Sequence, residues 1–60
     1  MNKRLSELLK EEFLTEDELN EIYSMENVTV KYNGSSNTLI NYYCFTVYTS
    51  DRKEYDIYVI

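Results

Sequence analysis

The first apolar positions of the chain recur at helical spacing. Leu5, Leu8, Leu9 and Phe13 stand at i, i+3, i+4 and i+8, which is the spacing of one face of an amphipathic helix. The charged residues between them fall off that face. The pattern therefore predicts a helix over about residues 3–13, with the four apolar side chains in the core.

A second helix is predicted directly after the first. Thr15 is a favourable N-cap, and Glu18 stands three residues later, where its side chain can complete a capping box. Leu14 and Leu19 occupy the two positions of a hydrophobic staple. We expect a helix over about residues 16–25, and one continuous helix bent near Thr15 is the alternative. The residues expected to face inward are Leu19, Ile22 and Tyr23.

From residue 27 the hydrophobic period changes to two. Val28, Val30 and Tyr32 alternate with polar residues, which predicts a half-buried strand over about residues 27–33. The segment NGSSN at 33–37 has the composition of a turn, with Gly34 suited to a positive φ. Further strands are predicted over about residues 38–49 and 54–60, joined by the turn SDRKE. Because neither connection can hold a crossover helix, the strands form an antiparallel meander with 38–49 at its centre.

The two turns set the pairing register, and the register sets the faces of the sheet. A three-residue loop at 51–53 gives the pairs Ser50–Glu54, Val47–Ile57 and Phe45–Val59. The first turn gives the pairs Asn33–Thr38, Tyr32–Leu39 and Val28–Tyr43. One face is then apolar except at Asn41, where we expect a bulge, and it consists of Val28, Val30, Tyr32, Leu39, Tyr43, Phe45, Val47, Tyr55, Ile57 and Val59. With the helices packed on this face, residues 1–60 form a single two-layer α+β domain.

The opposite face of the predicted sheet is also rich in apolar side chains. Tyrosine and threonine have a high strand propensity and tolerate exposure, which explains single residues but not a cluster. Because no helix remains to cover this face, we expect it to meet another protein surface, most simply in a homodimer. The residues predicted for self-association are Ile40, Tyr42, Cys44, Tyr48, Tyr58 and Ile60.

The net charge of −5 is concentrated in the first half of the chain. Residues 1–26 carry three basic and eight acidic side chains, whereas residues 27–60 carry three of each. This balance argues against binding a phosphate backbone or an anionic membrane. An acidic run with no basic residue inside it predicts a surface that binds a basic protein partner, and a merely solubilising helix surface is the alternative. The run consists of Glu11, Glu12, Glu16, Asp17, Glu18, Glu21 and Glu26.

The residue types present make catalysis and cofactor binding unexpected. The chain has no histidine and one cysteine, Cys44, so a Cys/His zinc site and an internal disulfide are excluded. The carboxylates lack the spacing of a calcium loop, and we expect no metal, no cofactor and no enzyme activity. Exposed tyrosines could stack single-stranded bases, but only Lys31 supplies a cation on their face, so we expect no direct nucleic-acid binding. The N-terminus lacks the apolar run of a signal peptide, and we expect a protein of the bacterial cytoplasm.

The segment VTVKYNGSSNTLINYYCFTVYTSDRKEYDIYVI, in a short acidic chain, resembles the meander of some anti-CRISPR proteins. These are small phage or mobile-element inhibitors that block a CRISPR nuclease by presenting carboxylates as a substitute for DNA. Much of that family's acidity lies in sheet loops and a C-terminal helix, whereas the sheet half is neutral here. The resemblance implies an inhibitor that binds a basic nucleic-acid channel through the acidic run. The alternative is a homodimeric structural or regulatory module that associates through its sheet face.

Overall fold

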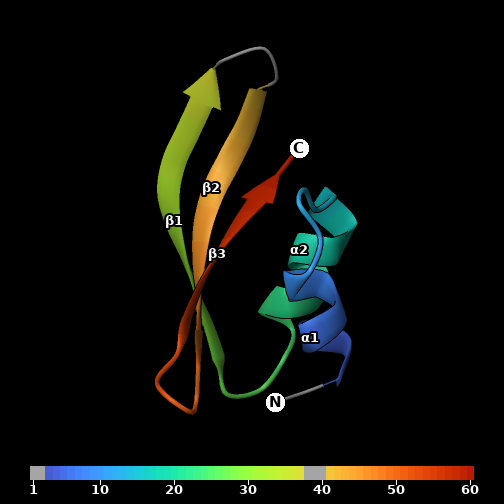
Figure 1. Ribbon diagram of the computed structural model, residues 1–60, viewed down its shortest axis with the longest axis vertical. Helices are drawn as coiled ribbons and strands as arrows, with labels where there is room; N and C mark the ends of the chain where they lie inside the picture. The colour runs from blue at the N-terminus through green and yellow to red at the C-terminus, as the bar shows by residue number, and fades with distance from the viewer. Residues whose placement is uncertain (1–2, 38–40) are drawn as a thin grey trace.

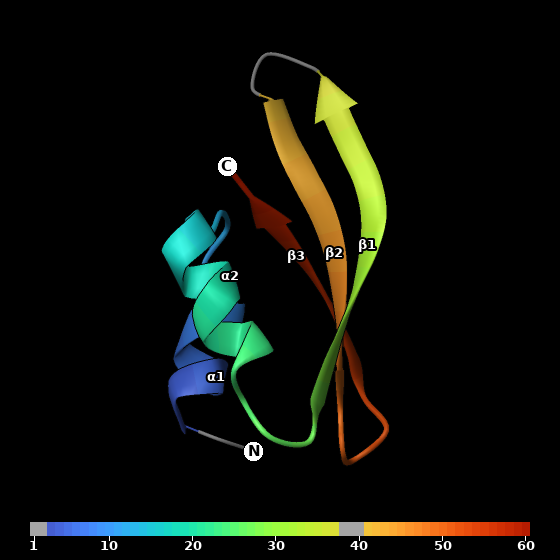
Figure 2. The same ribbon diagram turned by 180° about the vertical axis from the view of Figure 1, so that it is seen from behind.

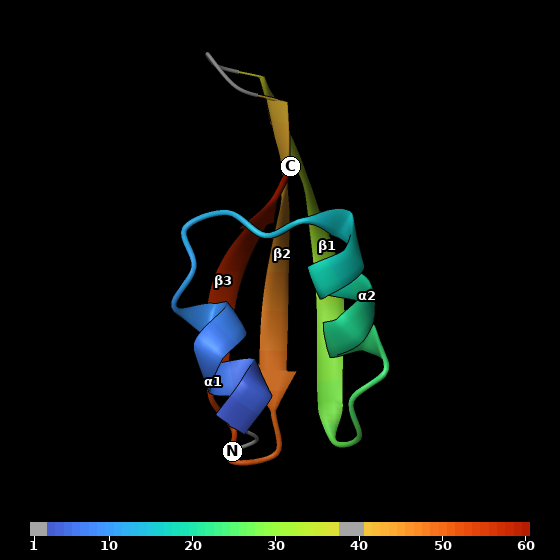
Figure 3. The same ribbon diagram turned by 90° about the vertical axis from the view of Figure 1, so that its right-hand side faces the viewer.

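The computed structural model describes residues 3–37 and 41–60, which form two helices followed by three strands (Figure 1). The elements are α1 (Lys3–Leu9), α2 (Glu16–Tyr23), β1 (Val28–Asn37), β2 (Asn41–Thr49) and β3 (Glu54–Val59). The strands form an antiparallel sheet in the order β1-β2-β3, so the predicted meander with a central second strand is confirmed. Both helices lie on the same side of the sheet (Figures 1 and 3). The α+β class is confirmed, with two separate helices.

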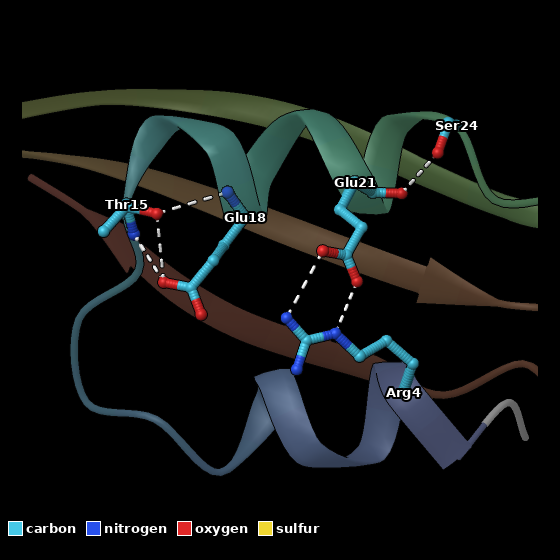
Figure 4. Close-up of polar contacts among 5 residues, drawn as sticks. All are labelled: Arg4, Thr15, Glu18, Glu21 and Ser24. Atoms are coloured by element: carbon cyan, nitrogen blue, oxygen red, sulfur yellow. Dashed lines mark hydrogen bonds and ion pairs between the residues drawn. The ribbon is translucent and has the colours of Figure 1, made fainter.

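The boundary of α2 follows the local sequence. The Thr15 side chain accepts a hydrogen bond from the Glu18 amide at 3.3 Å, and the Thr15 amide donates to Glu18 Oε1 at 2.9 Å (Figure 4). This reciprocal pair is the predicted capping box, and it satisfies two amides that the helix start leaves unpaired. The helix ends at Tyr23, where the Ser24 amide still donates to Asn20 O at 3.2 Å.

Helix α1 is shorter than predicted, because it ends at Leu9 rather than near residue 13. Leu14 has instead an extended conformation beside β3, where its amide donates to Tyr58 O at 2.8 Å and its carbonyl accepts from the Ile60 amide at 3.0 Å. A residue that joins a sheet edge cannot also belong to a helix, so this pairing overrides the helical spacing of the sequence. The bridge also covers the outer edge of β3, which would otherwise present unpaired backbone groups.

The NGSSN segment is part of β1, so the predicted turn at 33–37 is wrong. The register between β1 and β2 shifts between Tyr32 and Gly34, which leaves Asn33 as the extra residue of a β-bulge. Gly34 does have the predicted positive φ, at 111°, but it uses that conformation in the bulge rather than in a turn. The connection from β1 to β2 lies outside the described residues, as do Thr38, Leu39 and Ile40.

The register of both hairpins differs from the prediction. Phe45 pairs with Ile57 rather than Val59, because the three-residue loop spans 50–52 instead of 51–53 and ends on Arg52 at φ 65°. On the other side Val28 pairs with Thr49 rather than Tyr43, and Asn41 pairs regularly with Asn37 without the bulge expected there. The slip between β2 and β3 is two residues, and a slip of two keeps every side chain on its face.

The core lies between the helices and the predicted face of the sheet. The buried residues are Leu5, Leu8, Leu14, Leu19, Ile22, Phe45, Val47, Ile57 and Val59. Three tyrosines that were predicted to face inward are about half exposed: Tyr23 at 52%, Tyr32 at 53% and Tyr43 at 51%. Tyr32 and Tyr43 are exposed because the helices are short and the β1–β2 hairpin extends beyond them (Figure 2).

Candidate protein-interaction site

The second face of the sheet is partly covered by the chain itself. The Phe13 ring meets the Tyr42 ring edge-on, with centroids 5.6 Å apart, and lies 6.3 Å from the Tyr58 ring. Tyr42 and Tyr58 also meet edge-on at 5.4 Å. Because Leu14 pairs with Val59 and is buried in the core, the preceding residue is directed to the other side of the sheet. The prediction that Phe13 lies in the core, and that this face has no cover within the chain, is wrong.

A polar network divides the second face. The Asn33 amide donates from Nδ2 to Thr46 Oγ1 at 2.6 Å, and Thr46 Oγ1 donates to Asp56 Oδ1 at 3.2 Å. Thr46 is 8% exposed, so its hydroxyl is buried with both hydrogen-bonding roles satisfied. Asn33 was not predicted as part of this network, because its role depends on the bulge. The face is therefore less apolar than the alternation predicts.

The residues predicted for self-association do not form one continuous patch. Tyr42, Cys44 and Tyr48 are half-buried, and Tyr58 is 38% exposed. Ile60 lines a groove on the helix side of the sheet instead. Ile40 lies outside the described residues. Self-association through this face stays a prediction, but its original reason, an uncovered face, no longer holds for Tyr42 and Tyr58.

The negative charge of Glu21 is balanced by a basic residue from outside the acidic run. Arg4 on α1 forms a bidentate ion pair with it, through Nε at 2.5 Å and a terminal nitrogen at 3.3 Å (Figure 4). The guanidinium hydrogen bond lowers the pKa of the Glu21 carboxyl. This contact joins the two helices, so Glu21 serves the fold and is less available to a partner.

Glu18 also has a structural role. Its hydrogen bond from the Thr15 amide is the main cause that lowers the pKa of the Glu18 carboxyl. Glu11, from the segment after α1, lies beside it, and hydrogen bonding to Glu18 raises the pKa of the Glu11 carboxyl. The fold thus brings together two carboxyls that are seven positions apart in sequence.

The remaining acidic residues of the run are exposed. Glu12, Glu16 and Asp17 stand around the start of α2, and we call these three the acidic end. Glu26 follows the other end of α2 and lines a separate cavity of about 320 Å³ with Leu5. The structure therefore divides the predicted surface: the acidic end can face one partner, whereas Glu26 belongs to the opposite end of the helix.

A groove adjoins the acidic end, with a volume of about 390 Å³. Glu16 and Leu19 of α2 form one wall, and the sheet and the C-terminal residue form the other. This groove was not predicted, because it arises where the β1–β2 hairpin extends beyond the start of α2. The described residues that line it are Glu16, Leu19, Tyr43, Phe45, Val59 and Ile60.

Three further features of the described residues concern metal ligands, the cysteine and the length of the helices. Within residues 3–37 and 41–60, no three acidic or cysteine side chains gather as a metal site requires. Cys44 is half-buried and pairs across the sheet with Tyr58. Among the same residues, no helix is long and apolar enough to cross a membrane. Comparison with protein-family models, with curated proteins and with solved structures found no match.

Proposed function

We propose that the chain is a small acidic protein-interaction module that binds a basic surface of a partner through its acidic end. The observation that carries the proposal is that Glu12, Glu16 and Asp17 are exposed and take part in neither ion pair of the described residues. Those pairs use Glu21 and Asp51 instead.

The helix dipole explains only part of this arrangement. Carboxylates in the first turn of a helix are favourable, which accounts for Glu16 and Asp17 without any partner. Glu12 precedes the helix and gains nothing of this kind, and Glu11 lies close enough to Glu18 for its ionisation to be opposed. The exposed carboxylates of the acidic end present a negative field, and such a field complements a basic partner surface.

The partner class that fits such a surface best is a protein that binds nucleic acid. Surfaces that neutralise phosphates carry clustered Lys and Arg, and an acidic module can occupy them in place of DNA or RNA. The resemblance to anti-CRISPR proteins gives the specific form of this proposal: an inhibitor from a phage or mobile element that occupies the nucleic-acid channel of a host CRISPR nuclease.

The proposal is tested by capture from a bacterial lysate on the immobilised protein at low salt. Bound proteins are then released either by a salt step or by duplex DNA. We expect DNA-binding proteins that leave the resin with duplex DNA, because the two ligands compete for one basic surface.

Two charge-reversed variants of equal net charge locate the surface. Glu12→Lys/Asp17→Lys alters the acidic end, and Glu26→Lys/Glu54→Lys alters exposed carboxylates elsewhere. We expect the first variant to lose the captured proteins and the second to retain them. Equal capture by both variants would contradict the proposal, as would captured proteins that duplex DNA does not release.

The homodimeric module remains the second candidate, because half-buried Tyr48 still leaves apolar area on the second face. Sedimentation of the wild type and of Tyr48→Glu at micromolar concentration tests it, since Tyr48 has no ring contact among the described residues. A wild-type dimer that Tyr48→Glu dissociates would support this candidate. A monomer in both cases would reject it.

A further inference from the structure

The groove beside the acidic end has walls of two kinds. Its floor is apolar, with Leu19, Phe45 and Val59 all buried in the core cluster. Its rim includes the exposed carboxylate of Glu16 and the exposed side chains of Tyr43 and Ile60. At about 390 Å³ its volume lies near the lower end of the roughly 300–1,000 Å³ found for ligand pockets. That size suits one bulky side chain rather than a large ligand.

Exposed aromatic rings extend the rim along the hairpin. The Tyr32 ring lies 6.4 Å from the Tyr43 ring and 5.3 Å from the Phe45 ring, so the three form a continuous aromatic row. Tyr32 and Tyr43 are each about half exposed. Exposed tyrosine faces attract guanidinium groups, and arginine also pairs with carboxylates.

The charge around the groove selects its occupant. Glu16 lines it, Asp17 follows in the same helical turn, and Glu12 lies just before the helix. None of the described residues that line the groove is basic. An acidic segment would be repelled here, and a purely apolar one would leave the carboxylates unmatched.

We infer that this groove binds a peptide segment or loop in which a bulky apolar side chain is flanked by arginines. The apolar side chain enters between Leu19 and Phe45, and a flanking guanidinium lies between Glu16 and the Tyr43 ring. Arginine is one of the residue types most enriched in interface hot spots, and a buried side chain that fills a pocket commonly anchors such an interface. The inference rests on the proposed function, since it gives the acidic end its apolar anchor.

The test is an NMR titration of the isotope-labelled protein with the capped peptide acetyl-Arg-Leu-Arg-amide. We expect saturable shifts at the amides of Leu19, Tyr43, Val59 and Ile60, with millimolar affinity. Two control peptides, acetyl-Arg-Gly-Arg-amide and acetyl-Glu-Leu-Glu-amide, lack the anchor or the charge. The first should bind more weakly, and the second should not bind.

Variants of the protein check the two walls separately. Glu16→Gln and Tyr43→Ser should each weaken binding roughly threefold, as expected for one exposed charged or aromatic contact. Tyr48 lies on the other face of the same strand, so Tyr48→Ser should leave the affinity for the peptide unchanged. Equal shifts with the leucine and glycine peptides, or no effect of Glu16→Gln and Tyr43→Ser, would overturn the inference.

A second copy of the chain is the competing occupant. Dilution without peptide distinguishes it, since groove amides that shift with protein concentration would identify self-association and overturn the inference. The inference about the groove and the proposed function can be refuted independently. If the Glu12→Lys/Asp17→Lys variant loses its captured partner while Tyr43→Ser retains it, the acidic end binds without the groove. If the peptide binds as expected but no DNA-competed partner is captured, only the proposed function fails.

Discussion

Replacing Phe13 by alanine removes a ring from the α1–α2 connection that packs on the second face of the sheet. The ring contacts Tyr42 at 5.6 Å and Tyr58 at 6.3 Å, and the Phe13 side chain is half-buried. Leu14, which directs Phe13 to this side, keeps its own backbone pairing with β3 in the variant. The substitution therefore probes the cover of the second face and leaves the helical core intact.

The expected loss follows from the burial and the ring contacts. A fully buried phenylalanine costs about 3–5 kcal/mol on truncation to alanine, and half burial reduces this to about 2 kcal/mol. A domain of this length has roughly 3–5 kcal/mol in all, so the loss is a large fraction of its stability. With about 4–8 °C per kcal/mol for a small domain, the Tm should fall by about 10 °C.

A double-mutant cycle distinguishes a Phe13 ring that packs against Tyr42 from one that is buried in the core beneath the helices. In urea unfolding, Phe13→Ala and Tyr42→Ala should couple by about 0.5–1.5 kcal/mol, the usual value for an aromatic pair. The matched cycle of Phe13→Ala with Tyr32→Ala should show no coupling, because Tyr32 lies on the opposite face of the sheet. Tyr23→Ala, at a position that is 52% exposed, serves as the more exposed control and should cost clearly less than Phe13→Ala.

The reasoning would be refuted by a large cost for Phe13→Ala without coupling to Tyr42. That result would place the ring among the helical core residues, where the sequence spacing first puts it. A cost no larger than that of Tyr23→Ala would show instead that the second face is open in solution.

Three further predictions concern single features. Thr15→Ala should cost about 1 kcal/mol in urea unfolding because it removes the N-cap, and no change would contradict the capping box. Gly34→Ala should cost about 1–3 kcal/mol through its positive φ alone, since no atom lies near the added Cβ, whereas Ser35→Ala should be nearly neutral. Arg4→Met should raise the pKa of Glu21 toward its ordinary value in a carboxyl NMR titration, and an unchanged pKa would refute the pair. Because Arg4 lowers that pKa, the ion pair contributes fully to folding stability at pH values above the ordinary glutamate pKa. This contribution is lost as the pH falls through the lowered pKa of Glu21.

Local signals in the sequence predicted the start of α2 correctly. Thr15 and Glu18 form the capping box within four residues, so no distant contact is needed to specify it. The two faces of the sheet were also predicted well, although the register was wrong. The period of two fixes which side of a strand Phe45 and Val47 occupy, and the slip of two residues between β2 and β3 does not change it.

The errors arise where a local pattern fits two structures equally well. Asn33 and Gly34 have the composition of a turn and of a bulge alike, and only the pairing with β2 decides between them. Phe13 continues the helical spacing of α1, but the backbone bonds of Leu14 with β3 end the helix first. Such bonds join residues more than forty positions apart, so the sequence alone does not predict them.

The acidic residues of the candidate site were predicted, but not which of them remain available to a partner or that a groove lies beside them. The acidic run is visible in the sequence, whereas the pairing of Glu21 with Arg4 requires the packing of α1 against α2. The groove lined by Tyr43 and Ile60 depends on where the short helices end relative to the hairpin. That length difference could not be predicted while the end of the first strand was placed at residue 33.

The central claim is that the acidic end, rather than the tyrosines of the second face, is the binding surface. The most direct test is the dissociation constant of the captured, DNA-competed partner for Glu12→Lys/Asp17→Lys and for Tyr48→Glu, with circular dichroism to show that both variants are folded. We predict that the first variant weakens binding by at least about tenfold, as loss of close charge pairs at an interface does, and that the second leaves it unchanged. A partner that tolerates Glu12→Lys/Asp17→Lys but is lost with Tyr48→Glu would contradict the account and assign binding to the sheet face.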